Sequence, residues 1–158
     1  MATEIKSNGV YDFCGHSVYA ETSDRTTVIG SGYHSISANT GYCSTSINNG
    51  NNSVAVATYS GGISINNGNE CIAISSGNGG EAVVTGGNSI AIVTGWNGWA
   101  KGGVGDYLVL VERSDKDMST ILGVKVIQID GINFKADTWY KLKNNRVIKP
   151  RRGGCIPL

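Results

Sequence analysis

The fold is decided by residues 32–94, which read GYHSISANT, GYCSTSINN, GNNSVAVAT, YSGGISINN, GNECIAISS, GNGGEAVVT and GGNSIAIVT when written in nines. Glycine leads most of these nonapeptides, a small residue stands at position 4, positions 5 and 7 are mostly apolar, and Thr, Ser or Asn closes each repeat. Gly and Asn between short apolar runs are typical of turns that join strands. A fixed short period with one strand per repeat predicts stacked coils.

The same register runs without insertion from Cys14 to Glu112, which makes eleven repeats. Alternate repeats differ at position 9, where one set carries mostly Thr and the other mostly Asn or Ser. The coil is therefore expected to have 18 residues and two unlike arms. We predict an all-β protein, a β-solenoid of two nine-residue strand-turn arms per coil, in which successive coils lie about 4.8 Å apart.

Side chains alternate between the two faces of a strand. Because positions 5 and 7 are the apolar ones, we expect them to point into the solenoid and positions 6 and 8 to point outward. In the second arm the expected outward residues suit water: Ser46, Asn48, Ser64 and Asn66.

In the first arm the positions expected to face outward are small and apolar as well. A contiguous apolar strip on a surface calls for a cover, which is either a second copy of the chain or its own C-terminal segment, and symmetric self-association is the usual one. We therefore expect a homo-oligomer, a dimer or trimer, with this strip as its interface: Ala55, Ala57, Ala73, Ala91, Val93, Val109 and Val111.

From Asp106 the pattern changes to longer strand-like runs at 107–112, 121–129 and 139–142. Asp130-Gly131 has the composition of a hairpin turn. A solenoid end exposes unpaired strand edges, so a cap is expected there. We divide the chain into an N-terminal lead-in (1–13), the nonapeptide solenoid (14–112), and a C-terminal antiparallel β-meander cap with a basic tail (113–158).

Several of these motifs resemble a known family. GYHSISANT and GYCSTSINN, the run AKGGVGDYLVLVE at 100–112, VIQIDG at 126–131 and KADTWYKL at 135–142 are similar to the uncharacterised nonapeptide-repeat proteins of gut bacteria, their phages and prophages. The resemblance covers residues 14 to about 150. It implies an origin in a mobile element and carries no known activity. Family members often have a longer N-terminal region with cysteines and histidines, and we expect whatever that region does to be absent here.

Composition bounds the possible functions. The chain has 23 Gly, 2 Pro and 40% hydrophobic residues, which indicates a folded, turn-rich protein. A net charge of +1 offers no argument for binding duplex nucleic acid or a membrane surface. Without a basic segment followed by an apolar one at the N-terminus, we expect a cytoplasmic location, in the host cell if the protein is phage-encoded. Four cysteines without a C-x-x-C pair are expected to be buried or idle thiols.

Metal and catalytic sites have little support. Calcium-binding β-rolls carry an Asp in each repeat, whereas this chain has none between Ser35 and Gly105. His16 and His34 share position 3 of consecutive first-arm repeats; they either form a solvated turn ladder, which we favour, or share a metal. Neither has a partner spaced for a catalytic triad. We expect no cofactor, no metal and no enzyme activity.

Glu81 and Lys101 stand at positions expected to face the core, which requires an explanation because a buried charge must be paired or neutralised. Three interpretations stay open. In the first, a one-residue slip turns Ala82 and Val84 inward and exposes Glu81 to solvent. In the second, Glu81 and Lys101 form a buried ion pair. In the third, the pair has a functional role.

A candidate ligand site lies at the C-terminal end of the repeats. Trp96, Trp99 and Lys101 offer aromatic faces and a cation beside amide-rich backbone, which suits a base and a phosphate. The C-terminal tail is basic and contains Arg146, Lys149, Arg151 and Arg152. These residues either form an anion-binding rim beside the tryptophans or are simply a solvated terminus.

Two functions follow as hypotheses. The first is a non-enzymatic, oligomeric binding protein of a phage or mobile element that sequesters a small anionic ligand, such as a nucleotide signal of host immunity. The alternative is a structural trimeric β-solenoid of a virion or adhesin, which needs only the fold and the oligomer.

Overall fold

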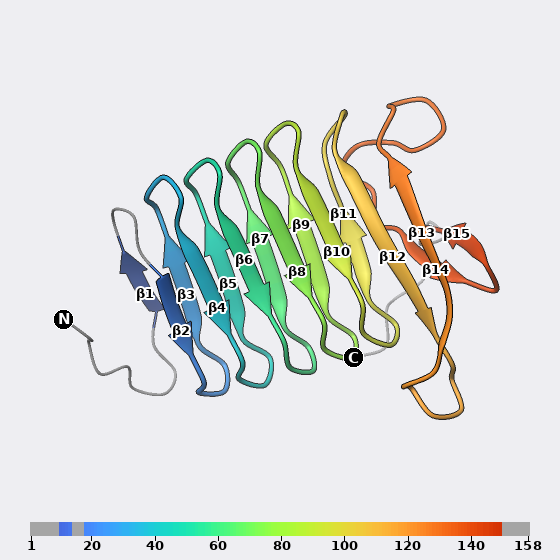
Figure 1. Ribbon diagram of the computed structural model, residues 1–158, viewed down its shortest axis with the longest axis horizontal. Helices are drawn as coiled ribbons and strands as arrows, with labels where there is room; N and C mark the ends of the chain where they lie inside the picture. The colour runs from blue at the N-terminus through green and yellow to red at the C-terminus, as the bar shows by residue number, and fades with distance from the viewer. Residues whose placement is uncertain (1–9, 14–17, 150–158) are drawn as a thin grey trace.

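The computed structural model describes residues 10–13 and 18–149, and it confirms the all-β solenoid. Strands of alternate arms stack into two parallel sheets that lie back to back along one axis (Figure 1). Sheet A contains β1 (Val10–Phe13), β3 (Thr27–Gly30), β5 (Thr45–Asn48), β7 (Ile63–Asn66), β9 (Glu81–Val84) and β11 (Trp99–Lys101). Sheet B contains β2 (Val18–Glu21), β4 (Ile36–Asn39), β6 (Val54–Ala57), β8 (Ile72–Ser75), β10 (Ile90–Val93), β12 (Tyr107–Arg113) and β13 (Ile121–Gln128).

The predicted 18-residue coil is confirmed by the strand register. Thr27 pairs with Thr45, and Ile36 with Val54, each 18 residues further along the chain. The last coil differs, because Ile90 pairs with Tyr107 and is therefore one residue short. The eleventh repeat is consequently shifted by one position relative to the ten before it.

The predicted direction of the side chains is wrong for most of the solenoid. In nearly every strand from β3 to β10, positions 6 and 8 are buried, while positions 5 and 7 are only half-buried. The second-arm residues expected in water, Ser46, Asn48, Ser64 and Asn66, are 0% exposed. In the first arm the expected interface residues are also interior, with exposures of 0–1%: Ala55, Ala57, Ala73, Ala91 and Val93. None of these five can contact another molecule.

Val109 and Val111 alone among the expected interface residues do face outward. The one-residue shift in the last coil places Leu108 and Leu110 inside, at 0% exposure, and leaves the two valines half-buried on the outer face. Among the expected interface residues, the outward direction of the side chain was thus predicted correctly only in the last coil, where the strand register is shifted by one residue.

The narrow interior explains the reversal. A Cβ added at Gly30 would lie 2.1 Å from Asn48 Oδ1, and one added at Gly80 would lie 2.0 Å from Ser75 Oγ. Only small or planar side chains fit between sheets this close, so size decides which face points inward. The buried amides satisfy backbone groups across the interior; for example, Asn66 Nδ2 donates to the carbonyls of Ser53 (3.0 Å) and Ile72 (2.8 Å).

Positions 3 and 4 of the repeat form the turn before each strand. Position 3 has a left-handed backbone in successive turns, with φ of 55° at Arg25, 58° at His34 and 56° at Glu70 as well as at Gly and Asn residues. In the first arm, position 4 forms a buried ladder in which each backbone N–H donates to the side chain of the next coil. One such ladder passes from Ser35 through Ser53, Cys71 and Ser89 to Asp106.

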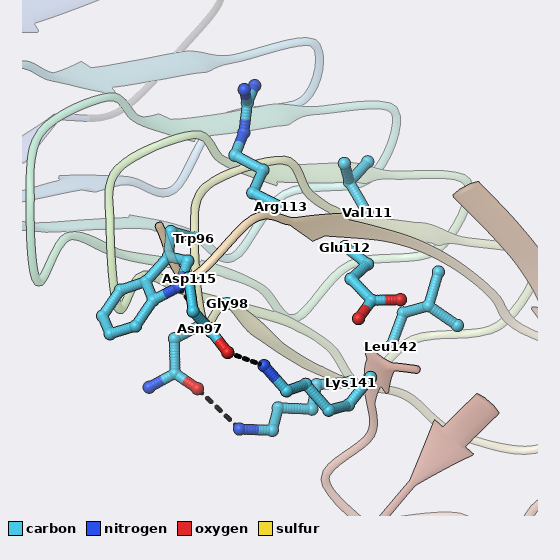
Figure 2. Close-up of a pocket in the computed structure, with 10 residues that line it drawn as sticks. Trp96, Asn97, Gly98, Val111, Glu112, Arg113, Asp115, Lys141 and Leu142 are labelled. Atoms are coloured by element: carbon cyan, nitrogen blue, oxygen red, sulfur yellow. Dashed lines mark hydrogen bonds and ion pairs between the residues drawn. The ribbon is translucent and has the colours of Figure 1, made fainter. Parts of the chain in front are cut away.

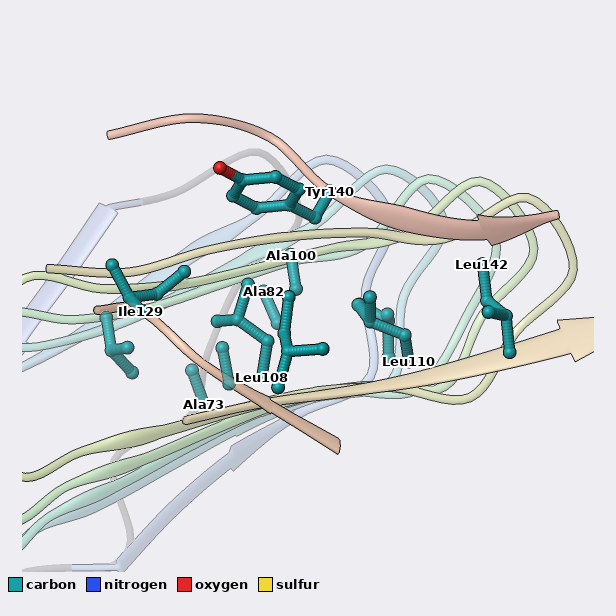
Figure 3. Packing of buried hydrophobic residues seen from close by; sticks show 12 residues of the cluster. Ala73, Ala82, Ala100, Leu108, Leu110, Ile129, Tyr140 and Leu142 are labelled. Carbon is teal, nitrogen blue, oxygen red and sulfur yellow. The ribbon is translucent and has the colours of Figure 1, made fainter. Parts of the chain in front are cut away.

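The C-terminal segment closes the end of the solenoid, as predicted. Strand β13 pairs antiparallel with β12, and β14 (Lys141–Lys143) forms a hairpin with β15 (Arg146–Ile148). Glu112 anchors that hairpin by accepting from the N–H groups of Asn144 (2.6 Å) and Asn145 (2.8 Å). At the end of the apolar interior, cap residues join the same cluster as Leu108 and Leu110 of β12: Ile127, Ile129, Tyr140 and Leu142. Figure 3 shows Ile129, Tyr140 and Leu142 with the two leucines.

The tight hairpin turn lies elsewhere than predicted. Asn144 and Asn145 form it, with φ of 50° and 54°. Asp130 and Gly131 instead begin a loop, where the Asp130 carboxylate accepts from the N–H groups of Ile132, Asn133 and Phe134. These bonds, from Phe134 first, lower the pKa of Asp130 to about 2.

Candidate functional site

The outer face of sheet B is a broad aliphatic surface. Its strands present positions 5 and 7 outward, in two columns that run along the rod. The first column is Val18, Ile36, Val54, Ile72, Ile90 and Tyr107; the second is Ala20, Ala38, Val56, Ile74, Ile92 and Val109. We call these residues, with Val111, Val124 and Val126 at the C-terminal end, the sheet B face.

This face is open to solvent in the single chain. At its two ends Val18 is 71% exposed, and Val124 and Val126 are 55% and 62% exposed. The residues of the two columns from Ile36 to Ile92 are half-buried, because neighbouring strands shield part of each side chain. No Asp, Glu, Lys or Arg lies among the residues of the sheet B face. Arg113 follows Val111 on the same side of β12, where it donates to the carbonyls of Thr94 and Ser119. Sequence reasoning placed positions 5 and 7 in the core, so of this surface it foresaw only Val109 and Val111.

The outer face of sheet A is mixed. It begins with Thr27 and Ile29 and ends with Trp99 and Lys101 on β11. The chain returns beside β11 through a bridge between Ala100 and Tyr140. This return brings two lysines over two indole rings: Lys141 Nζ lies 4.6 Å from the Trp99 ring centroid, and Lys101 Nζ lies 5.3 Å from that of Trp139.

Trp96 lies apart from that pair, in the turn before β11. Its indole N–H donates to Asp115 Oδ1 at 2.9 Å. Asp115 also forms an ion pair with Lys143, and these two contacts, the lysine first, lower the pKa of Asp115. Lys141 binds Asn97 Oδ1 at 2.5 Å, and burial lowers the pKa of its ammonium group. The polar groups here thus already bind one another.

A small pocket opens among these residues (Figure 2). Trp96, Asn97, Glu112, Asp115 and Lys141 contribute to its wall. Its volume of about 20 Å³ has room for a water molecule and not for a nucleotide. A larger ligand would have to lie across the outer surface rather than inside this pocket.

The predicted basic rim is only partly described. Arg146 begins β15 and is exposed, as is Lys149 after that strand. Arg151 and Arg152 lie outside the described residues. Sequence reasoning did not foresee Trp139 or Asp115 near the tryptophans, because the bridge to Ala100 that brings residues 139–143 back to β11 has no local sequence signal.

Glu81 needs no slip to leave the interior. It pairs in register with Ile63 and Trp99, and it lies on the outer face because every position 5 of sheet A does. Ala82 and Val84 point inward, at 0% and 1% exposure. Partial burial raises the pKa of Glu81, and the charge of Lys101 opposes that rise. The expectation that position 5 faces the core is therefore wrong at Glu81, and of the three interpretations the slip is not needed, because Ala82 and Val84 point inward without any change of register.

The histidine prediction is only half testable, since His16 lies outside the described residues. His34 has a left-handed backbone and packs edge-on against Tyr33, with ring centroids 4.2 Å apart. Within residues 10–13 and 18–149, no group of three His, Cys, Asp or Glu side chains is placed to hold a metal ion.

Comparison with protein-family models, with curated proteins and with solved structures gave no match to this chain. A search of the described residues for a helix long and apolar enough to cross a membrane also found none.

Proposed function

We propose that this protein is a non-enzymatic structural element that works as a homo-oligomer, as a part of a virion or an adhesin would. The observation that carries the proposal is the sheet B face, an uncharged aliphatic surface along the length of sheet B. A surface of this extent is costly to leave in water, at roughly 25 cal/mol per Å² of apolar area. A second copy of the chain would remove it from water.

The interior supports a structural role in a second way. Buried side-chain ladders connect coil to coil, so that each coil is held by hydrogen bonds to its neighbours. Fully satisfied buried networks rigidify the structure that they connect. A rod of this kind suits a spacer or scaffold.

The proposal is tested on the full chain by size-exclusion chromatography with light scattering, together with native mass spectrometry. Ile74 and Ile65 are matched positions: both are half-buried isoleucines at position 7, in sheet B and in sheet A respectively. The wild-type chain should be an oligomer at micromolar concentration. Ile74→Glu should give a folded monomer by circular dichroism, and Ile65→Glu should keep the oligomer. A monomeric wild type, or equal dissociation by both variants, would refute the proposal.

A second candidate function is the sequestration of a small anionic ligand. It is favoured by the two lysines that rest on Trp99 and Trp139 at the end of sheet A, where a planar anion could stack and pair. Thermal shift against mononucleotides and cyclic dinucleotides tests it, with Lys101→Met as the matched variant. A ligand shift that disappears in Lys101→Met supports this function, and the absence of any shift rejects it.

A further inference from the structure

We infer that two copies of the chain join through the sheet B face with their long axes pointing in opposite directions. This inference rests on the proposed function, because it names the partner and the geometry of the same surface. Its basis is the gradient of side-chain size along the two outward columns, together with the small area that the face offers.

The area requires nearly complete overlap of the two faces. Seven strands about 4.8 Å apart, each with four residues rising about 3.3 Å, cover on the order of 400 Å² in flat projection. Two such faces bury about 800 Å² before the relief of the side chains is added, and a specific interface needs about 1,000 Å². An arrangement that engages only some of the coils would fall short.

Two symmetric arrangements give full overlap of the same surface on both copies. With the two-fold axis parallel to the rod, each strand faces its own equivalent. With the axis parallel to the strands and passing through β8, the order is reversed: β2 faces β13, β4 faces β12, and β6 faces β10 of the second copy. The rods are parallel in the first case and antiparallel in the second.

Side-chain size separates these two arrangements. The second column grows from Ala20 and Ala38 to Ile74 and Ile92, and the first column ends at Tyr107. In the parallel arrangement small residues would meet small ones at the N-terminal end, and large would meet large at the other. The space between two straight sheets would then be empty at one end and overfilled at the other, and both conditions are destabilising.

The antiparallel arrangement evens out the layer. Ile36 then faces Tyr107 of the second copy, and Ala38 faces Val109 of the second copy. The two columns continue onto β13 as Gln128 and Val126, which pair with Tyr107 and Val109. Counted over the two columns with these residues included, opposed strand pairs contain about 12 to 16 side-chain heavy atoms, against about 8 to 22 in the parallel arrangement. The strands of sheet B follow one another in a row along the rod (Figure 1).

Pulsed electron paramagnetic resonance between spin labels tests the orientation without touching the face. Thr40, Thr58 and Ser76 are exposed, occupy the same turn position, and follow β4, β6 and β8. Each is changed to Cys, one at a time, in a full chain whose native cysteines are replaced by Ser. Cys71→Ser suits its site, because Ser53 and Ser89 occupy the same ladder.

The antiparallel pair predicts that the distance between the two labels depends on the coil. The two labels of a dimer should be offset along the rod by close to zero at Ser76. The offset should be about 10 Å at Thr58, which is two strand spacings, and about 19 Å at Thr40, which is four. Equal distances at all three sites would overturn the antiparallel arrangement while leaving the proposed function intact. A trimer by light scattering would also overturn it, and a monomer would defeat both proposals.

Discussion

The buried serine ladder gives the most direct test of how the solenoid is held together, through the substitution Ser53→Ala. Ser53 is 1% exposed, and its hydroxyl accepts the N–H of Ser35 at 3.1 Å. Alanine leaves that N–H buried without a partner, which costs about 1–3 kcal/mol. For a chain of this length that loss corresponds to a melting temperature lower by about 2–12 °C.

Thermal and urea unfolding followed by circular dichroism measure this effect. Ser76→Ala is the matched control, because the Ser76 hydroxyl is exposed and its bond to the Thr58 carbonyl is 3.4 Å long. It should change stability by less than about 0.5 kcal/mol. Ser53→Cys should retain most of the stability, since Cys71 accepts in the same ladder. If Ser53→Ala is as stable as Ser76→Ala, the ladder is not what joins the coils.

Three further predictions follow from the turns, the interior and the outer face. Glu70→Asn should stabilise the chain by about 0.5–1 kcal/mol in urea unfolding, because Glu70 has φ of 56° and Asn tolerates the left-handed region better; a loss of stability would contradict this. Ala73→Leu should cost about 1–3 kcal/mol by overpacking, whereas Thr45→Leu on the outer face of sheet A should cost less; equal costs would show that the interior is not tight. Burial raises the pKa of Glu81 above its ordinary 4.5, so protonated Glu81 makes the folded state more stable than ionised Glu81 does. This contribution to the free energy of unfolding is fully present below pH 4.5 and is lost as the pH rises through the pKa of the folded state. Glu81→Gln should therefore raise the melting temperature at pH 7 and leave it unchanged at pH 3, and a drop at pH 7 would contradict the assignment.

The solenoid could be predicted because its signals are local. The backbone turns left-handed every nine residues, and Gly or Asn occupies several of these positions, as at Asn52, Gly61 and Asn88. The difference between alternate repeats at position 9 was enough to predict the 18-residue coil. The bridge between Ala100 and Tyr140 could not be predicted, because it joins residues with no shared pattern.

The side chains that point inward were predicted wrongly because the prediction used hydrophobicity, whereas the size of the side chain decides which face of each strand points inward. A position that points into a narrow interior cannot vary much in volume, and from β3 to β10 positions 6 and 8 carry Gly, Ala, Ser, Asn or Val. Positions 5 and 7 tolerate Thr45, Glu81, Trp99 and Lys101, which marks them as outward. The apparent anomaly of two charges in the core disappears once this rule is applied.

The reversed facing ties stability to assembly. Many branched aliphatic residues of strands β3 to β10 lie on the outer faces of the two sheets, where they are only half-buried, so they contribute their full burial only when something covers them. In its N-terminal half the single chain depends on buried amide and hydroxyl hydrogen bonds, as at Asn39 and Ser46. A large apolar interior appears only near Leu108, Leu110 and the cap. Because a partner that binds only the folded state stabilises it by mass action, covering the sheet B face would stabilise most the coils whose own interior is polar.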